Sequence, residues 1–209
     1  MDCWAIIPVK PFRAGKSRLS GLLGSDDRAA LNRRLFGRVL DVTLGVFRPE
    51  RIVVVTADTV LFTMMHGQGL HALEDTGGGL NAALGLAGRY ALERDARAIA
   101  VLPCDLPQIS VDDVTALVAA GVRVPCCVIA PDSQEQGTNG LMLTPPEPDF
   151  FRFGADSFQA HIEAAKEHGM RVRILRRPGL AHDLDTPDEY RRYAKGQIAA
   201  ATDFHKLPV

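Results

Sequence analysis

Short runs of apolar, often β-branched residues alternate with longer segments of helical period along the chain. Strands of this kind are buried on both faces and helices cover them, which is the pattern of an α/β protein with a largely parallel sheet. We expect strands at 4–9, 51–56, 70–73, 98–102, 126–130, 140–144 and 171–175, and helices at 25–47, 80–94, 110–120, 157–168 and from 186 onward. Ser110 and Asp113 have the spacing of a capping box at the start of one of these helices.

The regular alternation fades after about Ser133, which predicts an antiparallel excursion or a lid on the main sheet in the second half of the chain. The sheet should therefore be mixed but mostly parallel. A chain of 209 residues with 46% hydrophobic content can bury one good core, so we expect a single domain over residues 1–209.

Composition narrows the class of partner. Lys and Arg total 24 against 25 for Asp and Glu, so no strong overall field attracts the chain to nucleic acid or to an anionic membrane. No apolar run reaches the roughly 18 residues that span a bilayer, and the first residues lack a basic signal-peptide region, so we expect a cytoplasmic location. The four cysteines and six histidines show no disulfide or zinc spacing.

A cationic loop follows the first strand and carries Lys10, Arg13, Lys16 and Arg18. In a doubly wound sheet ligands bind beyond the carboxyl ends of the strands, so this loop is placed to hold phosphates. Its Gly-Lys-Ser sequence is not a P-loop, because Lys10 stands where that motif needs its first glycine. Lys16 remains a candidate phosphate ligand, and the alternative is a solvated basic turn.

A buried strand at 98–102 ends in Asp105, which lies between Pro103 and Pro107. A rigid carboxylate at this end of a strand suits magnesium, which takes few protein oxygens together with waters and substrate phosphates. The alternative is a turn-forming aspartate.

A second acidic motif contains Asp183 and Asp185 on either side of Leu184. Strand alternation would direct both carboxylates to one face. Thr186 and Glu189 have the spacing of a capping pair at the start of a helix. Asp183 is a candidate metal ligand, whereas Asp185 could instead form local hydrogen bonds at the turn.

Glycine-bearing turns make up the third group of candidates. The turn at 75–81 allows a flat ligand such as a purine to approach the backbone closely, although an ordinary flexible turn has the same composition. The turns at 136–140 and 152–157 are polar, and the second opens a helix whose N-terminus could hold an anion. There the alternative is that Asp156 or Ser157 simply caps the helix.

Taken in order, IPVKPFRAGKSRL, LPCDLP, GTNG, FRFGADS and HDLDTPDEY resemble, nearly end to end, the CofC family of guanylyltransferases, which build the side chain of the deazaflavin coenzyme. The resemblance implies a GT-A-like, Rossmann-like three-layer α/β nucleotidyltransferase fold. It also implies a GTP-binding half at about 1–110 and an acceptor-binding half at about 111–195. The implied reaction transfers GMP from GTP to 3-phospho-D-glycerate, phosphoenolpyruvate or 2-phospho-L-lactate, with magnesium as cofactor.

The same resemblance assigns roles to matching positions. Lys16, Asp105 and Asp183 would be catalytic, with magnesium between the two aspartates. The remaining contacts would be Val9, Lys10, Lys16, Gly78, Leu80 and Asn81 for GTP, and Thr138, Gly154 and Ser157 for the phosphate and carboxylate of the acceptor. Cys104 stands where we expect glycine, which leaves the choice of acceptor open.

Two other functions stay open at this point. A molybdenum-cofactor or sugar-phosphate nucleotidyltransferase has the same fold, but its glycine-rich start is replaced here by Ile7-Pro8-Val9-Lys10. A non-catalytic GTP-binding module would not need both Asp105 and Asp183. The expected partners are GTP and a small phosphorylated acid, with no nucleic acid and no membrane; a homodimer is an option that the sequence leaves undecided.

Overall fold

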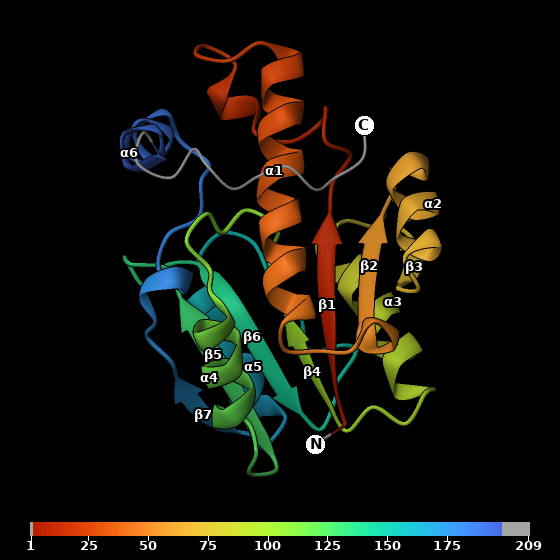
Figure 1. Ribbon diagram of the computed structural model, residues 1–209. Coiled ribbons are helices and arrows are strands. Elements are labelled where there is room, and N and C mark those ends of the chain that lie inside the picture. The colour runs from red at the N-terminus through yellow and green to blue at the C-terminus, as the bar shows by residue number, and fades with distance from the viewer. Residues whose placement is uncertain (1, 198–209) are drawn as a thin grey trace.

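A computed structural model describes residues 2–197 and contains one seven-stranded sheet in the order β3-β2-β1-β4-β6-β5-β7 (Figure 1). β6 runs antiparallel to both of its neighbours, β4 and β5, and the other neighbouring pairs are parallel. The mixed, mostly parallel sheet and the antiparallel excursion after residue 133 are therefore confirmed. The strands are β1 Cys3–Val9, β2 Ile52–Thr56, β3 His71–Glu74, β4 Ala98–Val101, β5 Cys126–Pro131, β6 Thr138–Thr144 and β7 Arg171–Ile174.

Helices pack on both faces of this sheet and make three layers (Figure 1). Side chains of α1, α2 and α4 belong to the apolar cluster on one face, and those of α3 and α5 to the cluster on the other. The helices are α1 Ser25–Leu44, α2 Thr59–Gly67, α3 Leu80–Leu92, α4 Val111–Ala120, α5 Ser157–Glu167 and α6 Pro187–Gln197, with short 3-10 turns η1 Ser17–Leu19, η2 Pro49–Arg51 and η3 Pro178–Leu180.

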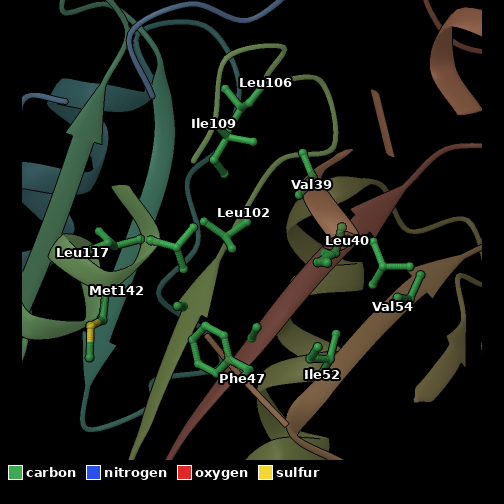
Figure 2. Packing of buried hydrophobic residues seen from close by; sticks show 14 of the residues in the cluster. Val39, Leu40, Phe47, Ile52, Val54, Leu102, Leu106, Ile109, Leu117 and Met142 are labelled. Atoms are coloured by element: carbon green, nitrogen blue, oxygen red, sulfur yellow. The ribbon is translucent and has the colours of Figure 1, made fainter. Parts of the chain in front are cut away.

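The core explains why these residues form these elements. Every residue of β2 and β4 is buried, as expected for central strands covered on both faces. Figure 2 shows Val39 and Leu40 of α1 and Val54 of β2, which belong to one apolar cluster. Full burial of each such side chain contributes about 1.5–3 kcal/mol to stability, and this packing fixes the helices against the sheet.

Two local features bear on the sequence predictions. The capping box of Ser110 and Asp113 is present at the start of α4. Helix α2, which has only nine residues, was not predicted. Its main local signal is Asp58, whose side chain caps the helix by accepting hydrogen bonds from the backbone N–H groups of Val60 and Leu61. Within residues 2–197, no helix combines the length and apolar character needed to cross a bilayer.

Candidate functional site

Three aspartates converge at the carboxyl edge of the sheet. One carboxylate oxygen from each of Asp105, Asp183 and Asp185 lies within 4.8 Å of the other two. Asp105 follows β4, whereas the other two come from the segment between η3 and α6. The structure thus brings together the two acidic motifs that the sequence suggested, with Asp185 beside the expected pair of metal ligands, Asp105 and Asp183.

A buried leucine holds the two acidic segments together. The backbone N–H of Leu184 donates to the backbone carbonyl of Asp105 at 3.1 Å. The Leu184 side chain is fully buried and packs in a small cluster with Leu19, Leu31 and Leu35. Residues 182–185 do not form a strand, so the expected strand alternation is wrong; the burial of Leu184 is what leaves its two acidic neighbours directed at the site.

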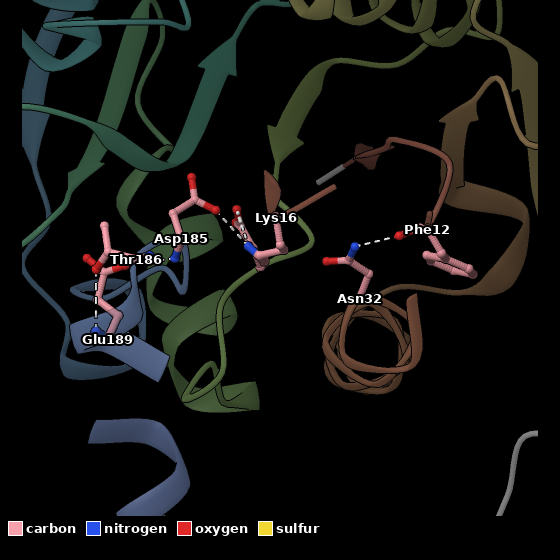
Figure 3. A network of polar contacts seen from close by, with 7 residues as sticks. Phe12, Lys16, Asn32, Asp185, Thr186 and Glu189 are labelled. Carbon is pink, nitrogen blue, oxygen red and sulfur yellow. Dashed lines mark hydrogen bonds and ion pairs between the residues drawn. The ribbon is translucent and has the colours of Figure 1, made fainter. Parts of the chain in front are cut away.

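The Lys16 ammonium bonds to two of these carboxylates, those of Asp105 and Asp185, and Figure 3 shows its contact with Asp185. Its Nζ is 2.8 Å from Asp185 Oδ1 and 3.3 Å from Asp105 Oδ2, and its side chain is only 4% exposed. Burial lowers the pKa of Lys16, but the charges of Asp105 and Asp185 outweigh burial and raise it overall. Lys16 is therefore a buried cation that offsets part of the negative charge of the acidic cluster.

The loop that carries Lys16 is anchored at both ends. Asn32 of α1 donates from Nδ2 to the carbonyl of Phe12 at 2.7 Å (Figure 3). Lys16 itself adopts left-handed backbone angles, with φ 58°, and starts η1, whose Leu19 is fully buried. These contacts direct the Lys16 side chain toward β4 instead of toward solvent.

Asp183 has a different electrostatic environment. Within residues 2–197, Lys16 forms ion pairs with the other two aspartates but none with Asp183. Burial, and then the negative charge of Asp105, raise the pKa of Asp183 to about 6. A divalent cation would relieve both effects, and three carboxylate oxygens are the donor set that a hard cation such as magnesium or manganese prefers.

Helix α6 holds Asp185 from the other side. Glu189 accepts hydrogen bonds at 2.7 Å from the backbone N–H groups of both Asp185 and Thr186 (Figure 3). The expected capping role of Thr186 and Glu189 is thus observed, and it also orients an acidic residue of the cluster.

A buried histidine, His161, links β6, which carries Thr138, to the segment that precedes α5. Thr138, at the start of β6, is 5% exposed and its Oγ1 lies 3.0 Å from His161 Nδ1. The backbone N–H of Arg152 donates to His161 Nε2 at 3.1 Å. Gly154, with φ 145°, and the buried Ser157 at the start of α5 follow in the same segment. Because β6 is antiparallel to β4, Thr138 lies at the same edge of the sheet as Asp105.

His161 was missed by the sequence analysis. The available signal was a histidine at helical spacing on the apolar face of α5, between Phe158 and Ala164. Such a position is usually an ordinary core position, so the residue type alone could not identify it.

The predicted GTP contacts fall into two groups. Val9 and the exposed Lys10 are at the carboxyl end of β1, beside β4. Gly78, Leu80 and Asn81 are exposed at the start of α3, but the Asn81 carboxamide is occupied: Nδ2 donates to the Phe153 carbonyl at 3.0 Å, and Oδ1 accepts from the Phe153 N–H at 2.8 Å. In this structure Asn81 positions the 152–157 segment.

Cys104, the residue that stands in place of the expected glycine, is a half-buried free thiol. Burial, and then the charge of Asp105, raise its pKa to about 12. It is therefore protonated at neutral pH and is not suited to be a nucleophile.

Known proteins resemble this chain along nearly its whole length. The family described as "Guanylyl transferase CofC like" matches residues 3–199. Phosphoenolpyruvate guanylyltransferase of Rubrobacter xylanophilus is 41% identical over 192 residues, covering 92% of this chain and 93% of that protein. The 3-phospho-D-glycerate guanylyltransferase of Colwellia psychrerythraea is 30% identical over 202 residues, covering 97% and 96%.

Solved structures agree on the fold. A protein described as a nucleotide-diphospho-sugar transferase from Desulfovibrio desulfuricans G20 has a TM-score of 0.75 at 18% identity and covers 96% of this chain and 89% of its own. Rv0371c from Mycobacterium tuberculosis, in complex with manganese, has a TM-score of 0.56 at 18% identity and covers 92% and 98%. The expected nucleotidyltransferase fold is confirmed. The chain belongs to the CofC-like guanylyl transferase family and is therefore an enzyme of the nucleotidyltransferase class.

Proposed function

We propose that this enzyme transfers GMP from GTP to the phosphate of a small three-carbon phosphorylated acid and releases pyrophosphate, with magnesium as cofactor. The observation that carries the proposal is the cluster of Asp105, Asp183 and Asp185, two of them paired with Lys16. The cluster lies at the sheet edge to which β6 brings Thr138. Relatives named as guanylyltransferases for phosphoenolpyruvate and 3-phospho-D-glycerate support it.

The chemistry requires two anions to meet, because a phosphate oxygen of the acceptor attacks the α-phosphorus of GTP in line with the departing pyrophosphate. The acceptor phosphate is already ionised at neutral pH, so no side chain needs to act as a general base. Catalysis then depends on positioning and on neutralising charge. Asp105, Asp183 and Asp185 would hold magnesium, which supplies charge neutralisation when bound.

Lys16 has two roles in this proposal. Without ligands its ammonium neutralises Asp105 and Asp185. With a divalent cation bound to those carboxylates, the Lys16 ammonium would be free to contact the phosphates of GTP. Val9, Lys10, Gly78 and Leu80 would contact the nucleotide, and Asn81 would act through its bonds to Phe153.

The acceptor pocket is proposed at Thr138, Gly154 and Ser157. Relatives at 41% and 38% identity are named phosphoenolpyruvate guanylyltransferases, which makes that compound the first acceptor to test. We further propose a single domain with a GTP-binding half at about 1–110 and an acceptor-binding half at about 111–195. We also propose a cytoplasmic location and a role in deazaflavin coenzyme biosynthesis. Whether the protein forms a homodimer can be measured directly.

The direct test is pyrophosphate release with GTP and each of phosphoenolpyruvate, 3-phospho-D-glycerate and 2-phospho-L-lactate, repeated with ATP and CTP. We expect release with GTP and one of these acids only. Equilibrium binding of GTP without release with any acceptor would instead indicate a non-catalytic module, and consumption of a sugar phosphate or a molybdopterin would favour the alternative transferases.

The matched variants are Asp105→Asn and Asp112→Asn. Asp105→Asn should fold, because its backbone contact to Leu184 is kept, but should lose at least about 100-fold in kcat, as is usual for removal of one group that stabilises transition-state charge. Asp112 is exposed on α4, and its variant should retain full activity. Normal turnover of Asp105→Asn at saturating magnesium would contradict the assignment.

A further inference from the structure

His161 occupies a fully buried position between β6 and the segment 150–157. Its ring stacks on Phe150, with centroids 5.9 Å apart and 1° between the planes, and meets Phe153 edge to face at 4.7 Å. Both ring nitrogens have partners: Nδ1 lies 3.0 Å from Thr138 Oγ1, and Nε2 lies 3.1 Å from the backbone nitrogen of Arg152. The ring therefore cannot turn without losing packing and hydrogen bonds together.

The contact with Arg152 determines the tautomer. A backbone N–H can only donate, so His161 Nε2 must present its lone pair and carry no proton. A neutral imidazole has its single proton on the other nitrogen, which places it on Nδ1. Burial, and then the charge of Arg152, lower the pKa of His161 to about 4, so the ring is neutral at pH 7.

The consequence falls on the Thr138 hydroxyl. Because Nδ1 carries a proton, Thr138 Oγ1 accepts from His161 and must direct its own proton elsewhere. Within residues 2–197 no protein group accepts that proton, although Thr138 is only 5% exposed. A buried donor without an acceptor is costly, so a ligand oxygen is the natural partner.

The next residue has the same property. Asn139 is 6% exposed, and its Nδ2 is buried without a hydrogen-bond partner among the described residues. It lies at a β-bulge, since Ala130 pairs with Gly140 while Pro131 pairs with Thr138. Two adjacent residues thus keep donors unused at the sheet edge that carries Asp105, an arrangement suited to an anionic oxygen.

We propose that His161 is a positioning residue that orients the Thr138 hydroxyl as an obligate hydrogen-bond donor to an anionic oxygen of the acceptor. The proposal rests on the proposed function for the identity of the acceptor. Arg152 determines which nitrogen of His161 is protonated, and His161 in turn determines the direction in which Thr138 donates.

The first experiment compares His161→Phe, which keeps the ring contacts with Phe150 and Phe153, with His161→Asn, whose amide can restore a donor near the Nδ1 position. His161→Phe should raise the KM for phosphoenolpyruvate about tenfold and leave the KM for GTP within about twofold, as expected for one directed hydrogen bond. His161→Asn should recover most of the loss. His168→Phe is the matched control, because His168 caps the C-terminus of the same helix and lies near the same Phe150, but bonds to the Ala164 carbonyl.

The second experiment is a double-mutant cycle with Thr138→Val. If His161 acts through the hydroxyl, His161→Phe should add less than about twofold in the Thr138→Val background. Full additivity, or an equal rise in the KM for GTP, would overturn the proposal and leave His161 a structural residue.

A third measurement separates this proposal from the proposed function. Nitrogen-15 NMR of the wild-type histidines at pH 7.5 should find His161 in the Nδ1–H form. A proton on Nε2 would overturn the proposal even in an active enzyme. Failure of all acceptors to release pyrophosphate would instead refute the proposed function, and the NMR result would then decide the hydroxyl orientation independently.

Discussion

At the residue scale, the proposed metal site implies a competition between Lys16 and a divalent cation for the acidic cluster. Lys16 and a divalent ion would both bind the carboxylates of Asp105 and Asp185, so each would weaken the binding of the other. Asp183 lies outside the Lys16 ion pairs and has a raised pKa. Its proton and a metal ion therefore compete in the same way.

Replacing Lys16 by methionine should separate metal binding from turnover. Lys16→Met removes the competing ammonium but keeps the stem, so manganese should bind the nucleotide-free protein about tenfold more tightly, measured by calorimetry. Turnover should fall at least about 100-fold, because the phosphates lose a cation. The exposed Lys166→Met is the control. Unchanged or weaker manganese binding would contradict the competition.

Metal binding should depend on pH through Asp183. Its raised pKa, about 6, means that the carboxyl group is protonated below that pH and cannot bind a cation. Manganese affinity should be flat above about pH 7 and fall up to about tenfold per unit below about pH 6. Asp183→Asn should bind more weakly at pH 8 and show a flatter profile. A wild-type affinity independent of pH between 5 and 8 would refute this.

At the element scale, the site depends on the packing of short segments. Leu19 of η1 and Leu184 beside α6 belong to one small apolar cluster with Leu31 and Leu35 of α1. Lys16 and the two C-terminal aspartates are thereby held relative to each other by apolar contacts near them. The site is assembled by the same leucines that bury these connections.

Truncating Leu184 should damage stability and metal binding together. Leu184→Ala should lower the free energy of unfolding by about 3 kcal/mol through lost burial and a cavity, measured in urea. It should also weaken manganese binding about tenfold, since Asp183 and Asp185 lose their anchor. Leu92→Ala, at a position 47% exposed, is the control and should change neither. Reduced stability with unchanged metal affinity would show that the leucine only packs.

At the scale of the whole molecule, the reversal of β6 combines two parts of the chain. Its antiparallel direction carries Thr138 to the carboxyl edge of β4, where Asp105 lies. The buried His161 then joins Thr138 to the loop before α5. Because His161 is buried in its neutral form, the free energy of unfolding should depend on the protonation of this residue.

Acid should destabilise the protein partly through His161. Its pKa is about 4 when folded and near 6.5 in an unfolded chain, so the unfolded state binds more protons between these values. The stability from this residue is present above about pH 6.5 and is lost as pH falls toward 4, up to about 3 kcal/mol. Urea unfolding at several pH values should show a smaller acid loss for His161→Phe. An equal slope in both proteins would contradict the linkage.

The fold and much of the candidate site could be predicted from local sequence. Apolar β-branched runs must become buried strands, and Asp105 follows one of them directly, so its place at the sheet edge was expected. Helix α2 was missed because nine residues carry little periodicity.

Contacts between distant segments determine the parts of the candidate site that the local sequence did not predict. The carboxylates of Asp183 and Asp185 face Asp105 because Leu184 is buried against another part of the chain, not because the segment is a strand. Asn81 is engaged by Phe153, and His161 bonds to Thr138 and Arg152. Periodicity reports which side of a segment is buried, because burial leaves an apolar pattern along the chain. It does not report the hydrogen-bond partner of a polar side chain, which depends on the packing of the whole molecule.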